Sequence, residues 1–250
     1  MLETLMAHSA PILHGGQVVF EGSLPMNQQW IYTVPDGVTS ICVVAVGCGG
    51  SGGGSLSYRN DIPVTPGERL IVRIDARHGT YAGVLRNRDF LCYARNGWKE
   101  GYGALGGKDL DAINDGGGNG GRAYVGSNGD TTAGGGAGGY TGKGGDGGSN
   151  YNVLGQNGQG GGGAGGTGVQ TGNIVNSRNG GGVGLNGIGP NGVAAQNSHG
   201  TAGSNGDGVK YGGGSGYPNY SIAGFLPGVG AVRIIWGPGR PTPPYNAPDV

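Results

Sequence analysis

The residues of this sequence that could do chemistry are few, and their spacing does not suit the common sites. The string GYTGKG puts Lys143 after Gly142, but a phosphate-binding P-loop needs glycine where Ala137 stands and Ser or Thr where Gly144 stands. Matches to G-x-G-x-x-G are unavoidable with 65 glycines in 250 residues. None of them follows a strand and opens a helix, so nucleotide binding is not expected.

The sequence gives equally little support for a metal site or a catalytic site. Asp109, Asp111 and Asp115 cluster, but the calcium-loop template D-x-D-x-D-G breaks at Ile113 and Asn114, so a solvated acidic loop is the favoured interpretation. The three cysteines and four histidines have no metal-ligand spacing. No nucleophile, base and carboxylate can be assembled from spacing. We therefore expect no enzyme, no catalytic residue, no metal and no cofactor.

The residues best suited to binding a partner are amide and aromatic side chains between glycine runs. Such groups hydrogen bond and stack on sugars or protein surfaces with little charge. A second interpretation is equally supported, in which they satisfy backbone groups at the ends of the glycine runs. The candidate binding residues are Tyr151, Asn152, Gln156, Gln170, Asn173, Arg178, Asn191, Gln196, His199, Tyr211, Tyr217 and Tyr220.

A glycine-rich tract from Gly116 to Gly216 must position these side chains. Glycine-rich tracts are usually disordered, but here the glycines are phased. A polyproline-II helix has three residues per turn, so residues three apart share one edge and the other two edges are nearly bare backbone. The residues that recur at every third position of Gly135–Ser149 are Ala137, Tyr140, Lys143, Asp146 and Ser149.

Such a helix makes no internal hydrogen bonds, so its backbone groups need partners on a neighbouring segment. The tract lacks the sustained G-X-Y period and the prolines of collagen. It therefore predicts an array of packed polyglycine-II helices, made by one chain folding back on itself. The run 134–149 is expected to form one rod of roughly 50 Å. Gly138, Gly145 and Gly165 are expected at contacts with no room for a Cβ, and Lys143 on an outer edge.

Ordinary strands are predicted before and after the glycine tract. Short runs rich in Val, Ile, Tyr and Phe alternate with turn residues, as in a sandwich or barrel. The string GAVRIIWG (230–237) has no β partner nearby in the sequence, so we expect it to return to the first strands with Val232, Ile234 and Trp236 on one face. The other predicted strands are 17–23, 29–34, 40–46, 56–64, 69–75, 80–85 and 90–94.

The fold class expected is all-β: an antiparallel β-sandwich, jelly-roll-like, with an inserted array of packed polyglycine-II helices and essentially no α-helix. Residues 1–16 form an N-terminal arm, and residues 17–100 plus 229–237 form the β-sandwich. Residues 101–228 form the glycine-rich array with its loops. Residues 238–250, rich in proline, are expected to be extended and exposed.

Composition sets further limits on function. Fifteen basic and fifteen acidic residues balance, which argues against sequence-independent nucleic-acid binding. Cys42 and Cys92 stand in apolar runs and are expected to be buried, and an odd cysteine count argues for assembly in a reducing compartment. No run approaches the roughly 20 apolar residues of a membrane span, and the first residues do not have the pattern of a signal peptide.

Three strings frame the glycine runs: WIYTVPDGVTSICVVAVGCGGSGGG, LSYRNDIPVTPGERLIVRI and GAVRIIWGPGRPTP. Together they resemble the glycine-rich proteins of tailed-phage virions, and the resemblance covers roughly residues 29–241. The glycine runs alone resemble the distal tail-fibre adhesins of T-even-type phages. Those adhesins stack polyglycine-II helices and bind outer-membrane receptors through the loops between them.

The resemblance implies a non-enzymatic virion protein assembled in the host cytoplasm. A tail or tail-fibre adhesin would bind a host cell-surface protein or glycan through the loops, whose sequence is expected to vary without unfolding the array. The alternative is a structural decoration, collar or baseplate subunit that uses the rods only as a rigid spacer. The implied partners are other virion proteins and a host receptor, without nucleic acid or membrane insertion, and a homo-oligomer is left open.

Overall fold

The structure is a computed structural model that describes residues 15–23, 27–77, 80–98, 102–125, 131–149, 153–171, 174–216 and 227–245. Within these ranges the chain forms fourteen strands and one four-residue helix, α1 (Gly107–Leu110). The strands pair antiparallel except for β11 with β12. The expectation of an all-β chain with antiparallel sheets is confirmed.

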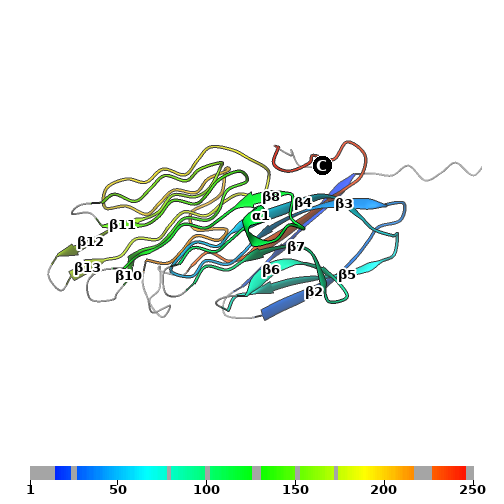
Figure 1. Ribbon diagram of the computed structural model, residues 1–250, viewed down its shortest axis with the longest axis horizontal. Coiled ribbons are helices and arrows are strands. Elements are labelled where there is room, and N and C mark those ends of the chain that lie inside the picture. The colour runs from blue at the N-terminus through cyan, green and yellow to red at the C-terminus, as the bar shows by residue number, and fades with distance from the viewer. Residues whose placement is uncertain are drawn as a thin grey trace, which may run out of the picture.

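Two sheets make up the β domain, seen on the right of Figure 1. All eight ordinary strands predicted from the sequence form, with ends that differ by at most two residues. The first sheet has the order β1 (Gly16–Glu21), β14 (Ala231–Trp236), β3 (Ser40–Val46), β4 (Leu56–Pro63) and β8 (Gly116–Gly118). The second has the order β2 (Asn27–Thr33), β5 (Arg69–Asp75), β6 (Tyr81–Arg86) and β7 (Asp89–Arg95).

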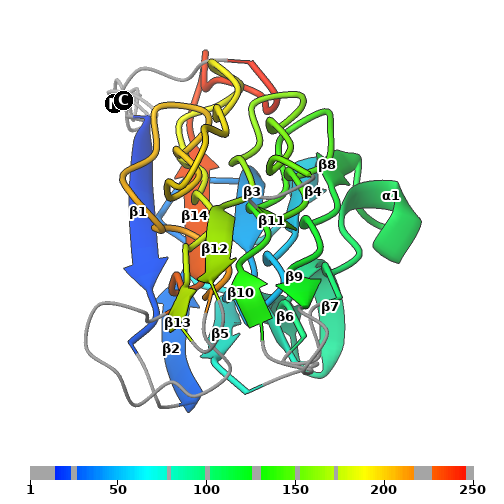
Figure 2. The same cartoon turned by 90° about the vertical axis from the view of Figure 1, so that its left-hand side faces the viewer.

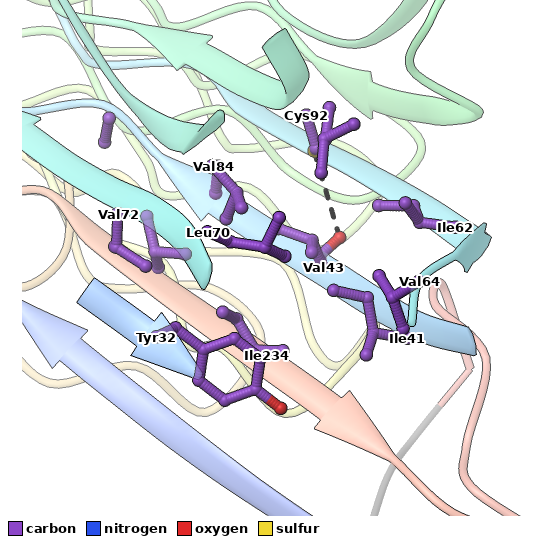
Figure 3. Packing of buried hydrophobic residues seen from close by; sticks show 14 of the residues in the cluster. Tyr32, Ile41, Val43, Ile62, Val64, Leu70, Val72, Val84, Cys92 and Ile234 are labelled. Carbon is purple, nitrogen blue, oxygen red and sulfur yellow. Dashed lines mark hydrogen bonds between the residues drawn. The ribbon is translucent and has the colours of Figure 1, made fainter. Parts of the chain in front are cut away.

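The two sheets pack face to face around one apolar core (Figure 3). The alternation in β5 sends Leu70 and Val72 into this core, where both are fully buried. They meet Val43 and Ile234 of the first sheet. Cys92 is also buried there, with its sulfur 3.9 Å from the carbonyl oxygen of Val43.

The return strand expected near the C-terminus is confirmed as β14, which lies between β1 and β3. Val232, Ile234 and Trp236 face the core between the sheets, as the alternation predicts. Ala231 packs on the opposite face of the sheet. The glycine-rich chain therefore leaves the first sheet and returns to its middle.

A glycine layer, made by the segments 47–55, 96–98, 102–106, 118–125, 131–149, 153–171 and 174–216, packs on that opposite face. A second apolar cluster joins Val44 and Leu56 of the first sheet to Tyr140, Val183 and Leu185 of the layer. Viewed end-on in Figure 2, the glycine segments lie on one side of the first sheet and β2, β5, β6 and β7 on the other. The molecule thus has three layers.

Backbone hydrogen bonds inside the glycine layer recur with a period of three residues. The N–H of Gly135 donates to the carbonyl of Ser51 at 3.1 Å, and that of Gly138 donates to Gly54 of the same segment at 2.9 Å. The two N–H groups between them donate to two other segments. The segment is therefore bonded to neighbours in three directions around its axis, whereas a strand bonds in only two.

The predicted lack of room for a Cβ is confirmed at all three glycines. An added Cβ would lie 2.1 Å from a carbonyl oxygen at Gly138, 1.8 Å at Gly145 and 2.0 Å at Gly165. Glycine is therefore needed at these positions because backbones approach each other closely.

The prediction of one long rod over residues 134–149 is wrong. The chain turns back after Tyr140, where the Gly139 N–H donates to the Gly142 carbonyl at 2.8 Å, and Gly136 then bonds to Gly145 of the returning segment at 2.9 Å. The reason is the fully buried Tyr140 side chain, which is held in the second apolar cluster. Lys143, three residues after Tyr140, lies in the returning segment and is partly exposed.

Two predicted boundaries also need correction. The glycine layer begins well before residue 101, because Gly54 donates to the Gly212 carbonyl at 2.7 Å and accepts from Gly138. The tail is not simply extended and exposed over residues 238–245. It turns back, buries Pro243 and accepts a 2.7 Å hydrogen bond from the side-chain amide of Asn60. The arm at residues 1–14 and the last five residues lie outside the described ranges.

Candidate functional site

Some of the described candidates, such as Gln170 and Arg178, lie at the outer end of the glycine layer, which we define as the end that carries β10–β13. This end is on the left of Figure 1, away from the second sheet. The short strands there are β9 (Tyr124–Val125), β10 (Thr131–Ala133), β11 (Gly148–Ser149), β12 (Thr167–Thr171) and β13 (Ile174–Asn176).

Half of the twelve candidate residues have side chains outside what the structure describes. Gln170 is part of β12, but only its backbone is described. The candidates that lie wholly outside the described ranges are Tyr151, Asn152, Asn173, Tyr217 and Tyr220.

Arg178 and His199 bond to neighbouring loop backbone at the outer end. The Arg178 guanidinium donates to the backbone carbonyl of Asn197 at 3.1 Å and to its side-chain oxygen at 3.0 Å. Nδ1 of His199 accepts the Asn179 N–H at 2.9 Å. Burial, helped by the nearby Arg178 charge, lowers the pKa of His199 and so favours the neutral ring that accepts this bond. Both side chains satisfy backbone groups.

The side chains of Asn191 and Tyr211 also form hydrogen bonds with other parts of the chain. The side-chain oxygen of Asn191 accepts the Gly161 N–H at 2.8 Å. The Tyr211 hydroxyl donates to the carboxylate of Glu21 in β1, which also pairs with Lys210 at 2.9 Å. Burial and this hydrogen bond raise the pKa of Tyr211 to about 12.

The remaining two candidates, Gln156 and Gln196, are exposed. The described candidates thus divide into side chains that satisfy backbone groups, one that ties β1 to the glycine layer, and two that face solvent. The sequence left both interpretations open because an amide looks the same in either role.

Sequence reasoning missed a set of exposed apolar side chains on the glycine layer. Tyr102 is 62% exposed, and most other large apolar side chains that are exposed in the described ranges belong to the same layer. The signal was present in the string NGWKEGYGAL (96–105), which spans the predicted boundary between the β-sandwich and the glycine-rich array and carries two aromatic residues. The exposed large apolar side chains of the glycine layer are those of Trp98, Tyr102, Leu105, Val125, Val153, Leu154 and Val193.

A hollow of about 370 Å³ opens beside β9, and we call it the tyrosine hollow. Its wall includes the Asp146 carboxylate, which accepts the backbone N–H of Arg122 at 2.6 Å and pairs with Lys143 at 2.7 Å. The hollow therefore combines aromatic rings with charged groups. Its lining residues are Tyr102, Arg122, Ala123, Tyr124, Val125, Asp146 and Gly147.

A second hollow, also of about 370 Å³, lies between the edge strand β1 and the glycine layer. Val19 and Leu185 give it apolar surface, and Glu21, Lys210 and Tyr211 form its charged wall. Because these three side chains bond to one another, this wall is already satisfied within the chain.

No cluster of three or more His, Cys, Asp or Glu that could hold a metal occurs in the described part of the chain. Over the same residues, no helix is long and apolar enough to cross a membrane. Cys48 and Cys92 are buried, and burial raises the pKa of both thiols, which keeps them protonated and unreactive.

Comparison of the chain with models of known protein families, with curated proteins and with solved structures found no match.

Proposed function

We propose that this chain is a non-enzymatic virion protein of a tailed phage, and that it acts as a tail or tail-fibre adhesin. It binds a protein or glycan on the host cell surface through side chains at the outer end of the glycine layer. The resemblance of the framing strings over residues 29–241 supports the class of protein. The observation that carries the binding role is a rigid glycine layer whose own bonds are mainly made by backbone, with apolar side chains left exposed on it.

The glycine layer is, in this proposal, an array of polyglycine-II helices. The period of three in the hydrogen bonds supports it, because a helix with three residues per turn directs every third N–H to the same side. Gly145 and Gly148 bond to Gly163 and Gly166 of one neighbour, again three residues apart. Carbonyl oxygens that lie where a glycine Cβ would otherwise stand give additional support, because they show how closely the segments pack.

For the β domain, a jelly-roll-like connectivity is part of the proposal. Its first strand, β1, lies beside its last, β14, which is compatible with that connectivity. The neighbours β5, β6 and β7 form a simple meander instead.

A layer of this kind separates structure from recognition. Its N–H and C=O groups are used in bonds between segments, so exposed side chains are free to contact a partner. An exposed apolar side chain on a surface loop has no role in the cores of this fold, and groups of such side chains commonly mark interaction sites. Val153 and Leu154, each 54% exposed, are adjacent at the outer end.

The test is binding of the purified, fluorescently labelled full chain to bacteria that adsorb particles carrying it. A V153S/L154S double variant is expected to reduce cell binding at least about tenfold, since burying two such side chains contributes more than 1.4 kcal/mol. The matched control is I31S, because Ile31 is 46% exposed on β2 of the β domain. Absence of wild-type binding to these cells would refute the adhesin role.

The alternative is a structural decoration, collar or baseplate subunit in which the glycine layer is a rigid spacer. Antibody labelling of intact particles distinguishes the two roles. An adhesin is expected at the end of a fibre or tail, accessible to the host surface. A collar, baseplate or capsid position combined with no cell binding would support the structural subunit.

A further inference from the structure

We propose that the tyrosine hollow is a binding subsite for an acidic saccharide, a sugar ring that carries a carboxylate. The proposal rests on the proposed adhesin function, since it names the chemistry of the receptor that one surface of the glycine layer would contact. The hollow is a separate site from Val153 and Leu154, so the two ideas can be tested independently.

The aromatic lining supplies the surface for a sugar ring. Tyr102 and Tyr124 both line the hollow, from segments that are more than twenty positions apart in the sequence. The 62% exposure of Tyr102 leaves most of its side chain available to a ligand. A tyrosine offers an apolar ring face for the C–H groups of a sugar and a hydroxyl for its polar groups.

The charges of the hollow favour an anionic ligand. Of the residues that line the hollow, Arg122 carries a positive charge and Asp146 a negative one. The Asp146 carboxylate is already bonded to the backbone N–H of Arg122 and to the ammonium of Lys143. Within the described residues the exposed Arg122 guanidinium forms no ion pair with a carboxylate. A guanidinium binds a carboxylate through two parallel hydrogen bonds, which suits a uronic or sialic acid.

The backbone around the hollow is held in place before any ligand binds. The Gly121 N–H donates to the Gly136 carbonyl at 2.8 Å, and the Gly147 N–H donates to the Arg122 carbonyl at 2.8 Å. The carbonyl of Tyr102 accepts the Trp98 N–H at 3.1 Å. Preformed sites lose less entropy on binding, which matters for the weak contacts of a single sugar.

The size of the hollow also suits a sugar. Its volume of about 370 Å³ is near the lower end of the range for small-ligand sites, roughly 300–1,000 Å³. One or two sugar rings match this volume, whereas a folded protein loop would contact a larger area. This consideration favours a glycan over a protein as the occupant.

The experiment uses the full chain and four defined probes in calorimetric or NMR titrations. The acidic probes are digalacturonic acid and N-acetylneuraminic acid, the neutral probe is digalactose, and the simple anion is inorganic phosphate. We expect at least one acidic saccharide to bind at least about tenfold more tightly than digalactose, because the carboxylate adds charge-assisted hydrogen bonds. Binding is also expected to weaken as salt is raised.

The variants R122Q and Y102A are each expected to weaken binding of the acidic saccharide at least about tenfold. The matched controls are R88Q, at the exposed turn between β6 and β7, and Y245A, where Tyr245 is 71% exposed on the C-terminal segment. Neither control should alter binding. Far-UV circular dichroism of each variant checks that the fold is retained.

Several outcomes would overturn the proposal. These are no binding of either acidic saccharide, equal binding of digalactose, equal binding of phosphate, or full binding by R122Q. Binding of the chain to cells without any saccharide binding refutes this subsite and leaves the adhesin function in place. Saccharide binding without cell binding supports the subsite and refutes the adhesin function.

Discussion

Replacing Gly145 by alanine tests whether close backbone contacts hold the glycine layer together. The added Cβ would lie 1.8 Å from the carbonyl oxygen of Gln156. Contacts between carbon and a carbonyl oxygen are normally about 3.3 Å or longer. The oxygen that it meets belongs to backbone and cannot rotate away as a side chain would. The segment that carries Gln156 therefore has to move by about 1.5 Å.

The cost of that shift follows from the hydrogen bonds that cross the contact. The Gln156 N–H donates to Asp146 at 2.8 Å, the Gln159 N–H donates to Lys143 at 2.9 Å, and the Gln156 carbonyl accepts the Gly165 N–H at 2.9 Å. A shift of about 1.5 Å breaks or badly distorts all three. At about 1 kcal/mol net for each bond, the loss is about 3 kcal/mol.

One effect opposes this loss. Alanine restricts the unfolded chain more than glycine does, which favours folding by about 0.4–1 kcal/mol. The net destabilisation expected for G145A is then about 2 kcal/mol. In a chain of this length that corresponds to a fall in melting temperature of about 4–8 °C.

The assay is thermal and urea unfolding followed by circular dichroism, with G189A as the matched glycine control. At Gly189 the nearest atom to an added Cβ is 3.0 Å away, so a shift of a few tenths of an ångström relieves the contact. A second control, K143A, removes a partly exposed ion pair and should cost less than about 1 kcal/mol. If G145A and G189A unfold at the same temperature, the close-contact model of the layer is wrong.

Three further predictions concern single side chains. Y140F should destabilise the chain by about 1–3 kcal/mol in urea titrations, because the buried hydroxyl bonds to two backbone groups of the glycine layer; an unchanged midpoint would contradict this. Hydrogen bonding to Tyr211 and Lys210 lowers the pKa of Glu21, so its contribution is present above the usual value near 4.5 and is lost as the pH falls through the lowered pKa. Since Glu21 is exposed, E21Q should remove less than about 1 kcal/mol of this acid-sensitive stability in melts between pH 3 and 7, and an identical pH profile for E21Q would contradict it. Buried Cys92 should react with a thiol reagent only at the rate of unfolding, and rapid reaction of the native chain would contradict its burial.

Much of the β domain could be predicted from local sequence, because its strands obey a period of two. In β5 the alternation assigns Leu70 and Val72 to the core, and both are buried there. The return of β14 follows from a simple requirement. An apolar run such as AVRIIW must find a β partner, and the earlier strands were the available ones.

The path of the glycine-rich chain was harder to predict, because a three-residue spacing of side chains does not show whether the chain continues straight or turns back. Tyr140 and Lys143 are three residues apart whether the chain continues straight or turns back between them. The turn is set by the burial of Tyr140 against the first sheet, which is a long-range contact. The tyrosine hollow depends on such contacts too, since Tyr102 and Tyr124 line one hollow only after the segments have packed.

The side chains that bond to backbone groups limit how freely the loop sequences can vary. The sequence predicts that the loops can vary without unfolding the array, but Arg178, Asn191 and His199 bond to backbone groups of the layer and its loops. Removing them leaves partly buried donors and acceptors unpaired, at a cost of about 1–3 kcal/mol each. Recognition is therefore best placed on exposed side chains that make no such bond, such as Tyr102 and Gln196. Substitutions at those positions can change the partner while the backbone network that holds them stays the same.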